Sequence, residues 1–262
     1  MVSKTQIDRL GDRLKQGNIS DADLKKLDEY RRSFSDAYEF VVGAIRNEFI
    51  LEPTGRPAKS TTSIVEKLLR ESIRLTQIQD IAGCRLIVSG VLEQERVVSL
   101  LMRFFPDASV TDRRATPSHG YRAVHVIISH DKKVVEVQVR TVLQHVWAEL
   151  SEKMSDVFDP AIKYGGGEDS ARRLLSTSSS VITTQEDYER ILEDSRRSVH
   201  NLLTQPSLSA QQKVELVQLQ IDVEDQTREL AERRANHLAS LQRAIARFGR
   251  LKTRGDPNAI PD

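Results

Sequence analysis

The sequence has little cysteine and no long apolar run. Its one cysteine, Cys84, excludes an internal disulfide framework and fits the reducing conditions of the cytosol. No stretch approaches the roughly 18 apolar residues that a membrane-spanning helix needs. The first residues, Met1 to Leu14, are charged rather than apolar, so we expect no signal peptide. These absences predict a cytoplasmic protein that is not bound to a membrane.

An excess of charge of one sign is also lacking, and so is any cluster with zinc-ligand spacing. The 262 residues carry a formal net charge of +1, which argues against coating of nucleic acid along the whole chain but permits a local basic patch. No set of cysteines and histidines has the spacing of a zinc site. The length suffices for one domain with a substantial core and an appended segment.

Apolar periodicity predicts helices at both ends of the chain and a mixed region between them. The expected helices cover residues 5–17, 21–50, 92–105, 169–176, 184–203 and 209–248, and Ser20 and Thr141 are expected to cap two helices. The expected strands cover residues 86–88, 108–112 and a hairpin. We therefore expect an α+β fold, in which helices flank a mixed β-sheet of about five strands. The expected division is residues 1–50 for N-terminal helices, 51–163 for the core and 164–262 for a helical C-terminal extension.

The stretch over residues 119–147 predicts a β-hairpin that runs into a helix. Its second strand alternates strictly between apolar and polar side chains, as Val135, Glu136, Val137, Gln138, Val139 and Arg140. Since successive side chains point to opposite faces, the valines enter a core and the polar residues share the other face. In the first strand the same parity places Tyr121 beside His125. A solvated sheet face would alternate in the same way, but this composition suits a nucleotide and a metal ion better than water.

A basic segment lies upstream of the hairpin. Two prolines and a glycine in residues 51–60 predict a loop, and a helix over residues 63–72 follows. We expect its cap near Thr61–Ser63, with Glu66 completing a capping box. The cations of this segment are Arg56, Lys59, Lys67, Arg70 and Arg74. Beside a helix N-terminus they would attract phosphate, although a solvated basic helix face has the same composition.

Three motifs, spread over about residues 40–160, resemble the synthetase domain of RelA/SpoT-type alarmone synthetases. The first contains Lys59, Ser60, Ser63, Ile64, Lys67 and Leu68, with Arg56 one place further from Lys59 than is common in the family. The second is DIAGCR, from Asp80 to Arg85, which matches the family's Asp-Ile-Ala-Gly-x-Arg pattern. Taken alone, an aspartate before a strand is usually a cap or turn residue. The third is GYRAVH with VEVQVRT and the following Trp147.

The resemblance implies a nucleotidyltransferase-like synthetase fold and transfer of pyrophosphate from ATP to the 3′-hydroxyl of GDP or GTP, which makes the (p)ppGpp alarmone. It assigns Mg²⁺ binding and catalysis to Asp80 and Glu136, with Glu136 also taking the hydroxyl proton. Gly83 would permit close backbone approach. It assigns ATP binding to Arg56, Lys59, Ser60, Lys67 and Arg85, and acceptor binding to Tyr121, Arg122, His125, Gln138, Arg140 and His145.

Two alternatives remain open from the sequence. Toxic members of the same family use this site on the 3′ CCA end of tRNA or on adenine nucleotides, and an antitoxin protein would then be a partner. Arg113 and Arg114, next to the hairpin, would contact tRNA in that case, and His145 replaces the Asn or Asp of many members. A non-catalytic nucleotide sensor is disfavoured by the two intact carboxylates. The C-terminal helices would pack on the domain or join subunits in a homo-oligomer.

Overall fold

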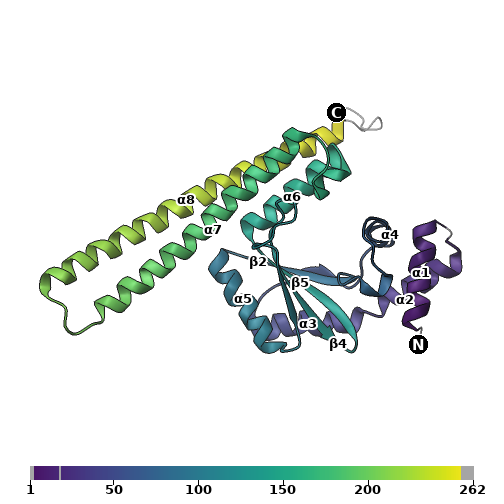
Figure 1. The fold of residues 1–262 in the computed structure, drawn as a ribbon, viewed down its shortest axis with the longest axis horizontal. Coiled ribbons are helices and arrows are strands. Elements are labelled where there is room, and N and C mark those ends of the chain that lie inside the picture. The colour runs from purple at the N-terminus through teal and green to yellow at the C-terminus, as the bar shows by residue number, and fades with distance from the viewer. Residues whose placement is uncertain (1–2, 18, 255–262) are drawn as a thin grey trace. The chain divides into compact units, whose positions relative to one another are not determined.

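The computed structural model describes residues 3–17 and 19–254, and the chain forms two compact units (Figure 1). Unit 1 comprises residues 1–87, 97–112 and 124–139, and unit 2 comprises residues 88–96, 113–123 and 140–262. The end of the expected C-terminal extension, residues 255–262, lies outside the described part. The division expected at residues 50 and 163 stays a prediction. No described helix is long and apolar enough to cross a membrane.

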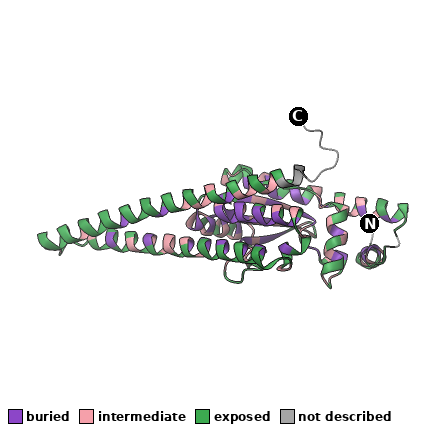
Figure 2. Ribbon diagram, turned by 90° about the horizontal axis from the view of Figure 1, so that it is seen from above, coloured by how far each residue is buried: buried purple, intermediate pink, exposed green. Residues whose placement is uncertain are grey.

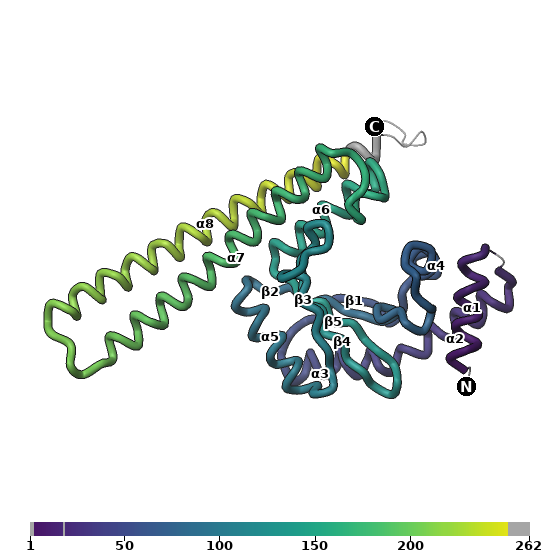
Figure 3. The backbone as a smooth tube through the Cα atoms, in the orientation of Figure 1, coloured from purple at the N-terminus to yellow at the C-terminus, as the bar shows by residue number. Residues whose placement is uncertain are grey.

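Unit 1 is built on a mixed five-stranded sheet in the order β1-β2-β5-β4-β3 (Figure 3). Its strands are β1 (Thr54–Arg56), β2 (Ala82–Val88), β3 (Ser109–Asp112), β4 (Val124–His130) and β5 (Lys133–Thr141). Antiparallel pairing joins β1 to β2, β3 to β4, and β4 to β5. The expected α+β fold with about five strands is confirmed.

The β4–β5 hairpin has the alternation that its sequence predicts. Val135, Val137 and Val139 are fully buried, whereas Glu136 and Gln138 are only partly buried. The turn residues Asp131 and Lys132 have φ values of 48° and 64°, as a two-residue hairpin turn that follows the twist of the strands requires. One expectation is wrong: β4 begins at Val124, so Tyr121 precedes the strand and pairs with Ser118 in an isolated bridge.

The helices of unit 1 are α1 (Lys4–Gln16), α2 (Asp21–Arg32), α3 (Ser35–Phe49) and α4 (Thr61–Arg70), with a 3-10 turn at Leu75–Gln77. The single helix expected over residues 21–50 is therefore two. The Ser33 hydroxyl donates to the Tyr30 carbonyl at 2.6 Å, which gives the backbone an alternative to helical bonding, and Phe34 is buried at the break. The expected Ser20 cap is confirmed.

A second correction concerns the start of α4. The residue that caps this helix is Ser60, whose hydroxyl accepts from the Ser63 amide at 3.2 Å. Glu66 is therefore too far along the helix to complete a capping box, because that role belongs to the third helical residue. The cap places the N-terminus of α4 directly after Lys59.

Unit 2 consists mainly of three helices, α6 (Val142–Val157), α7 (Asp169–Leu203) and α8 (Ala210–Arg254), with a 3-10 turn at Pro160–Tyr164; α5 (Val91–Phe104) begins in this unit and ends in unit 1. The expected Thr141 cap of α6 is confirmed. Trp147 of α6, Leu175 and Ile182 of α7 and Leu241 of α8 belong to one buried cluster. In Figure 2, exposed residues predominate towards the tip of the α7/α8 pair.

The two helices expected at residues 169–176 and 184–203 are one continuous helix. The intervening stretch is rich in serine and threonine, which have low helix propensity. The hydroxyls of Ser180, Thr183 and Thr184 each donate to the carbonyl four residues earlier, and packing against α6 and α8 holds the rest of the stretch. Tertiary packing outweighs local propensity here.

Candidate active site

The loop before α4 is held in unit 1 by three backbone contacts. The Lys59 amide donates to the Ile81 carbonyl at 2.6 Å, and the Lys59 carbonyl accepts from Arg31 Nε at 2.6 Å. The cap by Ser60 completes the set. The backbone of Lys59 is thus fixed between α2 and the start of β2, which directs its side chain towards Asp80.

Asp80 lies between two lysines. Its carboxylate oxygens accept from Lys59 Nζ at 2.5 Å and from Lys67 Nζ at 2.9 Å. All three side chains are largely buried. Burial raises the pKa of the Asp80 carboxyl, but the two ammonium groups lower it further, and its pKa ends below its usual value. Asp80 is therefore an anion at neutral pH, with a cation on each oxygen.

Glu136 projects from β5 and is held by two neighbours on the sheet. His125 Nδ1 lies 2.8 Å from Oε1, and Gln138 Nε2 donates to Oε2 at 2.7 Å. Burial raises the pKa of Glu136, whereas the hydrogen bonds and charge of His125 and the amide of Gln138 lower it, and its pKa ends below its usual value. The expected grouping of these three residues on one face is present.

Asp80 and Glu136 are close enough for their charges to interact, because the charge of Asp80 raises the pKa of Glu136. The strand that follows Asp80 and the strand that carries Glu136 approach closely at Gly83. A Cβ added there would lie 2.9 Å from the Glu136 carbonyl oxygen. β2 and β5 are neighbours in the sheet, and a side chain at position 83 would force them apart. The expected need for glycine at this position follows from that close approach.

These two carboxylates are a donor set that suits Mg²⁺. The described residues contain no group of three or more His, Cys, Asp or Glu that could hold a metal by themselves. Mg²⁺ prefers hard oxygen ligands and commonly takes only one or two carboxylates, with water and substrate phosphates as its other ligands. Asp80 and Glu136 fit that pattern, provided that phosphate draws Lys59 and Lys67 away from Asp80.

The two arginines expected at the ATP site lie on the neighbouring strands β1 and β2. Arg56 is exposed on β1, and Arg85 is partly buried on β2. The structure thus brings Lys59, Lys67 and Asp80 together, and Glu136 with its two neighbours. The roles expected for the two arginines stay predictions.

Of the residues expected to bind the acceptor, His125 and Gln138 lie in unit 1, whereas the others, Tyr121, Arg122, Arg140 and His145, lie in unit 2. Arg140 Nη2 donates to the Tyr121 hydroxyl at 2.9 Å, and the Arg140 guanidinium lies 5.0 Å from the centre of the Tyr121 ring. Arg140 is buried, whereas Tyr121 is partly exposed. His145 on α6 lies 3.5 Å from Glu149 across one helical turn.

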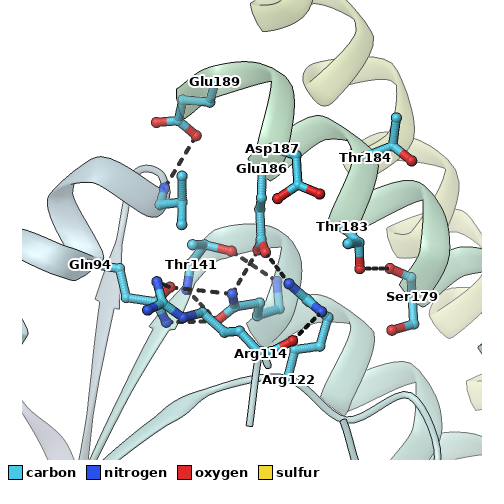
Figure 4. A network of polar contacts seen from close by, with 12 residues as sticks. Gln94, Arg114, Arg122, Thr141, Ser179, Thr183, Thr184, Glu186, Asp187 and Glu189 are labelled. Carbon is cyan, nitrogen blue, oxygen red and sulfur yellow. Dashed lines mark hydrogen bonds and ion pairs between the residues drawn. The ribbon is translucent and has the colours of Figure 1, made fainter. Parts of the chain in front are cut away.

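Arg114 and Arg122 have partners inside unit 2 (Figure 4). Arg122 Nη2 donates to Glu186 Oε2 at 2.6 Å, and both side chains are almost fully buried. Arg114 Nη1 lies 3.2 Å from Gln94 Oε1 and 3.3 Å from Glu95 Oε1. As acceptor or tRNA contacts these arginines would have to leave those partners, whereas Arg113 is exposed. Their functional roles stay predictions.

Sequence reasoning missed the residues that hold these segments from a distance. Arg31 of α2 binds the Lys59 carbonyl, Glu186 of α7 binds Arg122, and Ser179 of α7 donates to the Gly120 carbonyl at 2.7 Å. Each lies outside the motifs, 28 to 64 residues from its partner. No local pattern marks them, since a serine or a charged residue on a helix is most often a surface residue.

The central part of the chain is similar to a known protein family. Residues 55–155 match the family described as "Region found in RelA / SpoT proteins". An uncharacterized protein of Mycobacterium tuberculosis is 38% identical over 111 residues, which is 41% of this chain and 41% of that protein. The chain thus covers well under half the length of this relative. The GTP pyrophosphokinase YwaC of Bacillus subtilis is 29% identical over 163 residues, 50% of this chain and 78% of that one.

The fold also has a counterpart among solved structures. The crystal structure of the small alarmone synthetase 1 from Bacillus subtilis bound to its product pppGpp aligns with a TM-score of 0.50 at 21% identity. The alignment covers 65% of this chain and 97% of that one. At this identity the likeness establishes the fold.

Proposed function

This chain carries a RelA/SpoT synthetase domain at residues 55–155, and we propose that it transfers the pyrophosphate of ATP to the 3′-hydroxyl of GDP or GTP. The observation that carries the proposal is the pair of ionised carboxylates, Asp80 and Glu136, with Lys59 and Lys67 on the first of them. Cations that sit on a carboxylate in a phosphate-binding loop can move to the phosphates of a nucleotide. The products are AMP and a 3′-pyrophosphorylated guanine nucleotide.

ATP binds to the cations around the start of α4. Lys59 and Lys67 exchange Asp80 for phosphate oxygens, and the N-terminus of α4 after Ser60 adds unpaired amides and the positive end of a helix dipole. Arg85 and Arg56 contact the adenine side of the donor. Asp80 and Glu136 would hold Mg²⁺, which would supply positive charge to offset the negative charge of the transferred phosphates.

Glu136 takes the proton of the acceptor. The 3′-oxygen forms a bond to the β-phosphorus of ATP while the bond from that phosphorus to the bridging oxygen of the α-phosphate breaks, and AMP leaves with that oxygen. The proton of the hydroxyl passes to a Glu136 oxygen and then to solvent. His125 and Gln138 keep Glu136 ionised and fix its orientation before the proton moves.

The acceptor is held by an aromatic ring and by polar side chains. Tyr121, oriented by Arg140, stacks on the acceptor base. Gln138, Arg140 and His145 provide hydrogen-bond donors towards the base and the ribose. In-line positioning of the two substrates supplies most of the rate enhancement, since phosphoryl transfers need little covalent help from protein.

The test is a transfer assay with γ-labelled ATP and Mg²⁺, with GDP, GTP, ATP and deacylated tRNA offered in parallel. We expect label on a guanine nucleotide. Label on tRNA or on ATP alone would instead assign the acceptor of the toxic members and direct attention to the exposed Arg113. No label on any acceptor would contradict the proposal.

The assay also separates catalysis from ATP binding. Glu136→Gln keeps the size of the side chain but removes the base, so turnover should fall by a factor of about 100 or more while ATP binding is retained. Asp131→Asn, at an exposed turn position, is the matched control and should transfer at the wild-type rate. Full turnover by Glu136→Gln would remove Glu136 from the role of base.

A further inference from the structure

Helix α7 lies beyond residues 55–155, yet two of its side chains bind the segment Gly120–Arg122. We propose that Ser179 and Glu186 are positioning residues that hold this segment, and Tyr121 within it, for the acceptor nucleotide. We call the contacts of Ser179 and Glu186 with the segment Gly120–Arg122 the clamp. The identity of the ligand rests on the proposed function, whereas the clamp consists of contacts within unit 2.

Ser179 fixes the backbone just before the tyrosine. Its hydroxyl donates to the Gly120 carbonyl at 2.7 Å, and its side chain is buried. Gly120 has a φ of 89°, and a Cβ added there would lie 2.8 Å from Trp147 Cζ2 and 3.3 Å from Ser179 Cβ. The Gly120 backbone is therefore enclosed between α6 and α7, in a conformation and a space that only glycine fits. The direction in which the chain enters Tyr121 is set there.

Glu186 fixes the residue just after the tyrosine. One of its oxygens accepts from Arg122 Nη2 and the other from Gln144 Nε2, each at 2.6 Å. The side chains of Arg122 and Glu186 are 5% and 3% exposed, so little water competes with the ion pair. A guanidinium buried in this way cannot be left unpaired without a large cost, and the segment is tied to α7.

Tyr121 is thus held through both of its neighbours as well as through its own hydroxyl. Its amide donates to the Ser118 carbonyl at 2.9 Å, and its hydroxyl accepts from Arg140. A ring that is oriented before the ligand arrives does not lose that freedom on binding, which favours affinity. Through these contacts α7 holds the segment that carries Tyr121 in place for the acceptor nucleotide.

The same face of α7 supports a further segment of unit 2. Glu189 Oε2 accepts from the Val91 amide at 3.1 Å, at the start of α5 (Figure 4). Arg190 Nε donates to Glu95 at 2.9 Å. Because one rigid helix carries these contacts, a shift of α7 would displace the acceptor segment as well.

Each test variant has a neighbour on α7 as its control. Ser179→Ala removes the bond to Gly120, and Ser180→Ala removes a hydroxyl that bonds only within α7, to the Ser176 carbonyl. Glu186→Gln removes the charge that faces Arg122, and Asp187→Asn alters an exposed carboxylate one residue away. Ser179→Ala is the milder change and remains informative if Glu186→Gln fails to fold.

The steady-state readout separates positioning from general damage. We expect the acceptor KM to rise about fivefold in Ser179→Ala and about tenfold in Glu186→Gln, in line with the loss of one neutral and one charged hydrogen bond. The ATP KM and kcat should stay within twofold, and both controls should match the wild type. An unchanged acceptor KM, or equal changes in both KM values and kcat, would overturn the inference.

Hydrogen exchange provides a readout that does not depend on catalysis. The amides of residues 113–123 should exchange faster in Ser179→Ala than in the wild type, and at the wild-type rate in Ser180→Ala. If the wild type transfers label to no acceptor, the proposed function fails. The hydrogen-exchange rates still test whether Ser179 holds the segment Gly120–Arg122 in place. Unchanged exchange in Ser179→Ala would overturn the clamp itself.

Discussion

Asp80 and Glu136 stay ionised in a largely buried setting through different kinds of partner. Asp80 is balanced by the ammonium groups of Lys59 and Lys67, whereas Glu136 is held by His125 and Gln138 from the same sheet. A lysine ammonium group can exchange a carboxylate for a phosphate as its partner, whereas a side chain packed on a neighbouring strand moves little. We expect the first pair of contacts to change on ATP binding and the second to persist.

The two lowered pKa values make a prediction about acid stability. A carboxyl whose folded pKa lies below its unfolded value contributes stability above the unfolded value, near 3.8 for Asp80 and 4.5 for Glu136. That contribution is lost as the pH falls through the folded pKa values. The free energy of unfolding should therefore decrease as the pH is lowered from 7 to 3.

Urea unfolding at a series of pH values measures this slope. In Asp80→Asn the slope should be shallower than in the wild type, because one of the two carboxylates is gone. The same stability should be measured by circular dichroism and by Trp147 fluorescence if the transition is two-state. A slope in Asp80→Asn that equals or exceeds that of the wild type would contradict the charge balance described for this site.

At the scale of elements, α2 holds the loop before α4 as α7 holds the segment Gly120–Arg122. Arg31 Nε donates to the Lys59 carbonyl at 2.6 Å, and its Nη1 lies 3.5 Å from Thr61 Oγ1 at the start of α4. The helix precedes residues 55–155, so neither support belongs to the segment that matches the family.

Removal of the contact between Arg31 and the Lys59 carbonyl should weaken the binding of ATP and leave the binding of the acceptor unchanged. Arg31→Ala should raise the ATP KM by about tenfold or more, since a hydrogen bond from a charged donor contributes about 1.5–3 kcal/mol. Arg32→Ala, next to it on the same helix and 78% exposed, is the control. Steady-state kinetics with each substrate varied in turn would decide this, and a rise confined to the acceptor KM would refute it.

At the scale of the whole molecule, the core of unit 2 is shared among three helices. α6 contributes Leu143, Val146, Trp147 and Leu150 to a cluster that α7 and α8 complete with Leu175, Ile182 and Leu241. The Trp147 indole donates to the Leu175 carbonyl at 2.9 Å. α6 therefore lacks a buried environment without the C-terminal helices, although most of it falls inside residues 55–155.

A fragment of residues 1–163 should consequently fail to fold as an independent unit. It would expose the apolar face of α6, so we expect aggregation, or solvent-exposed Trp147 fluorescence without a cooperative unfolding transition. The control shortens the tip of the α7/α8 pair between residues 200 and 222, where no described residue is buried, and should unfold as the full chain does. A cooperative transition in the 1–163 fragment would support the boundary expected at residue 163.

Much of this molecule follows from local sequence alone. The alternation along β5, the caps at Ser20 and Thr141 and the grouping of Glu136 with Gln138 depend on residues a few positions apart, and periodicity and cap chemistry act over that range. The resemblance to the RelA/SpoT family likewise rests on short motifs in order, and residues 55–155 match that family. The break after Arg32 and the unbroken α7 were mispredicted because side-chain bonding and packing outweighed propensity there.

Only the tertiary structure decided which partners hold the site. Arg122 and Glu186 are 64 residues apart, Gly120 and Ser179 are 59 apart, and Arg31 is 28 residues from Lys59. The free energy of such contacts depends on burial and on mutual distance, neither of which is a property of a local stretch of chain. The amino-acid sequence determined which groups are candidates for the chemistry, and the packing of α2 and α7 determined which side chains hold two of the candidate segments in place.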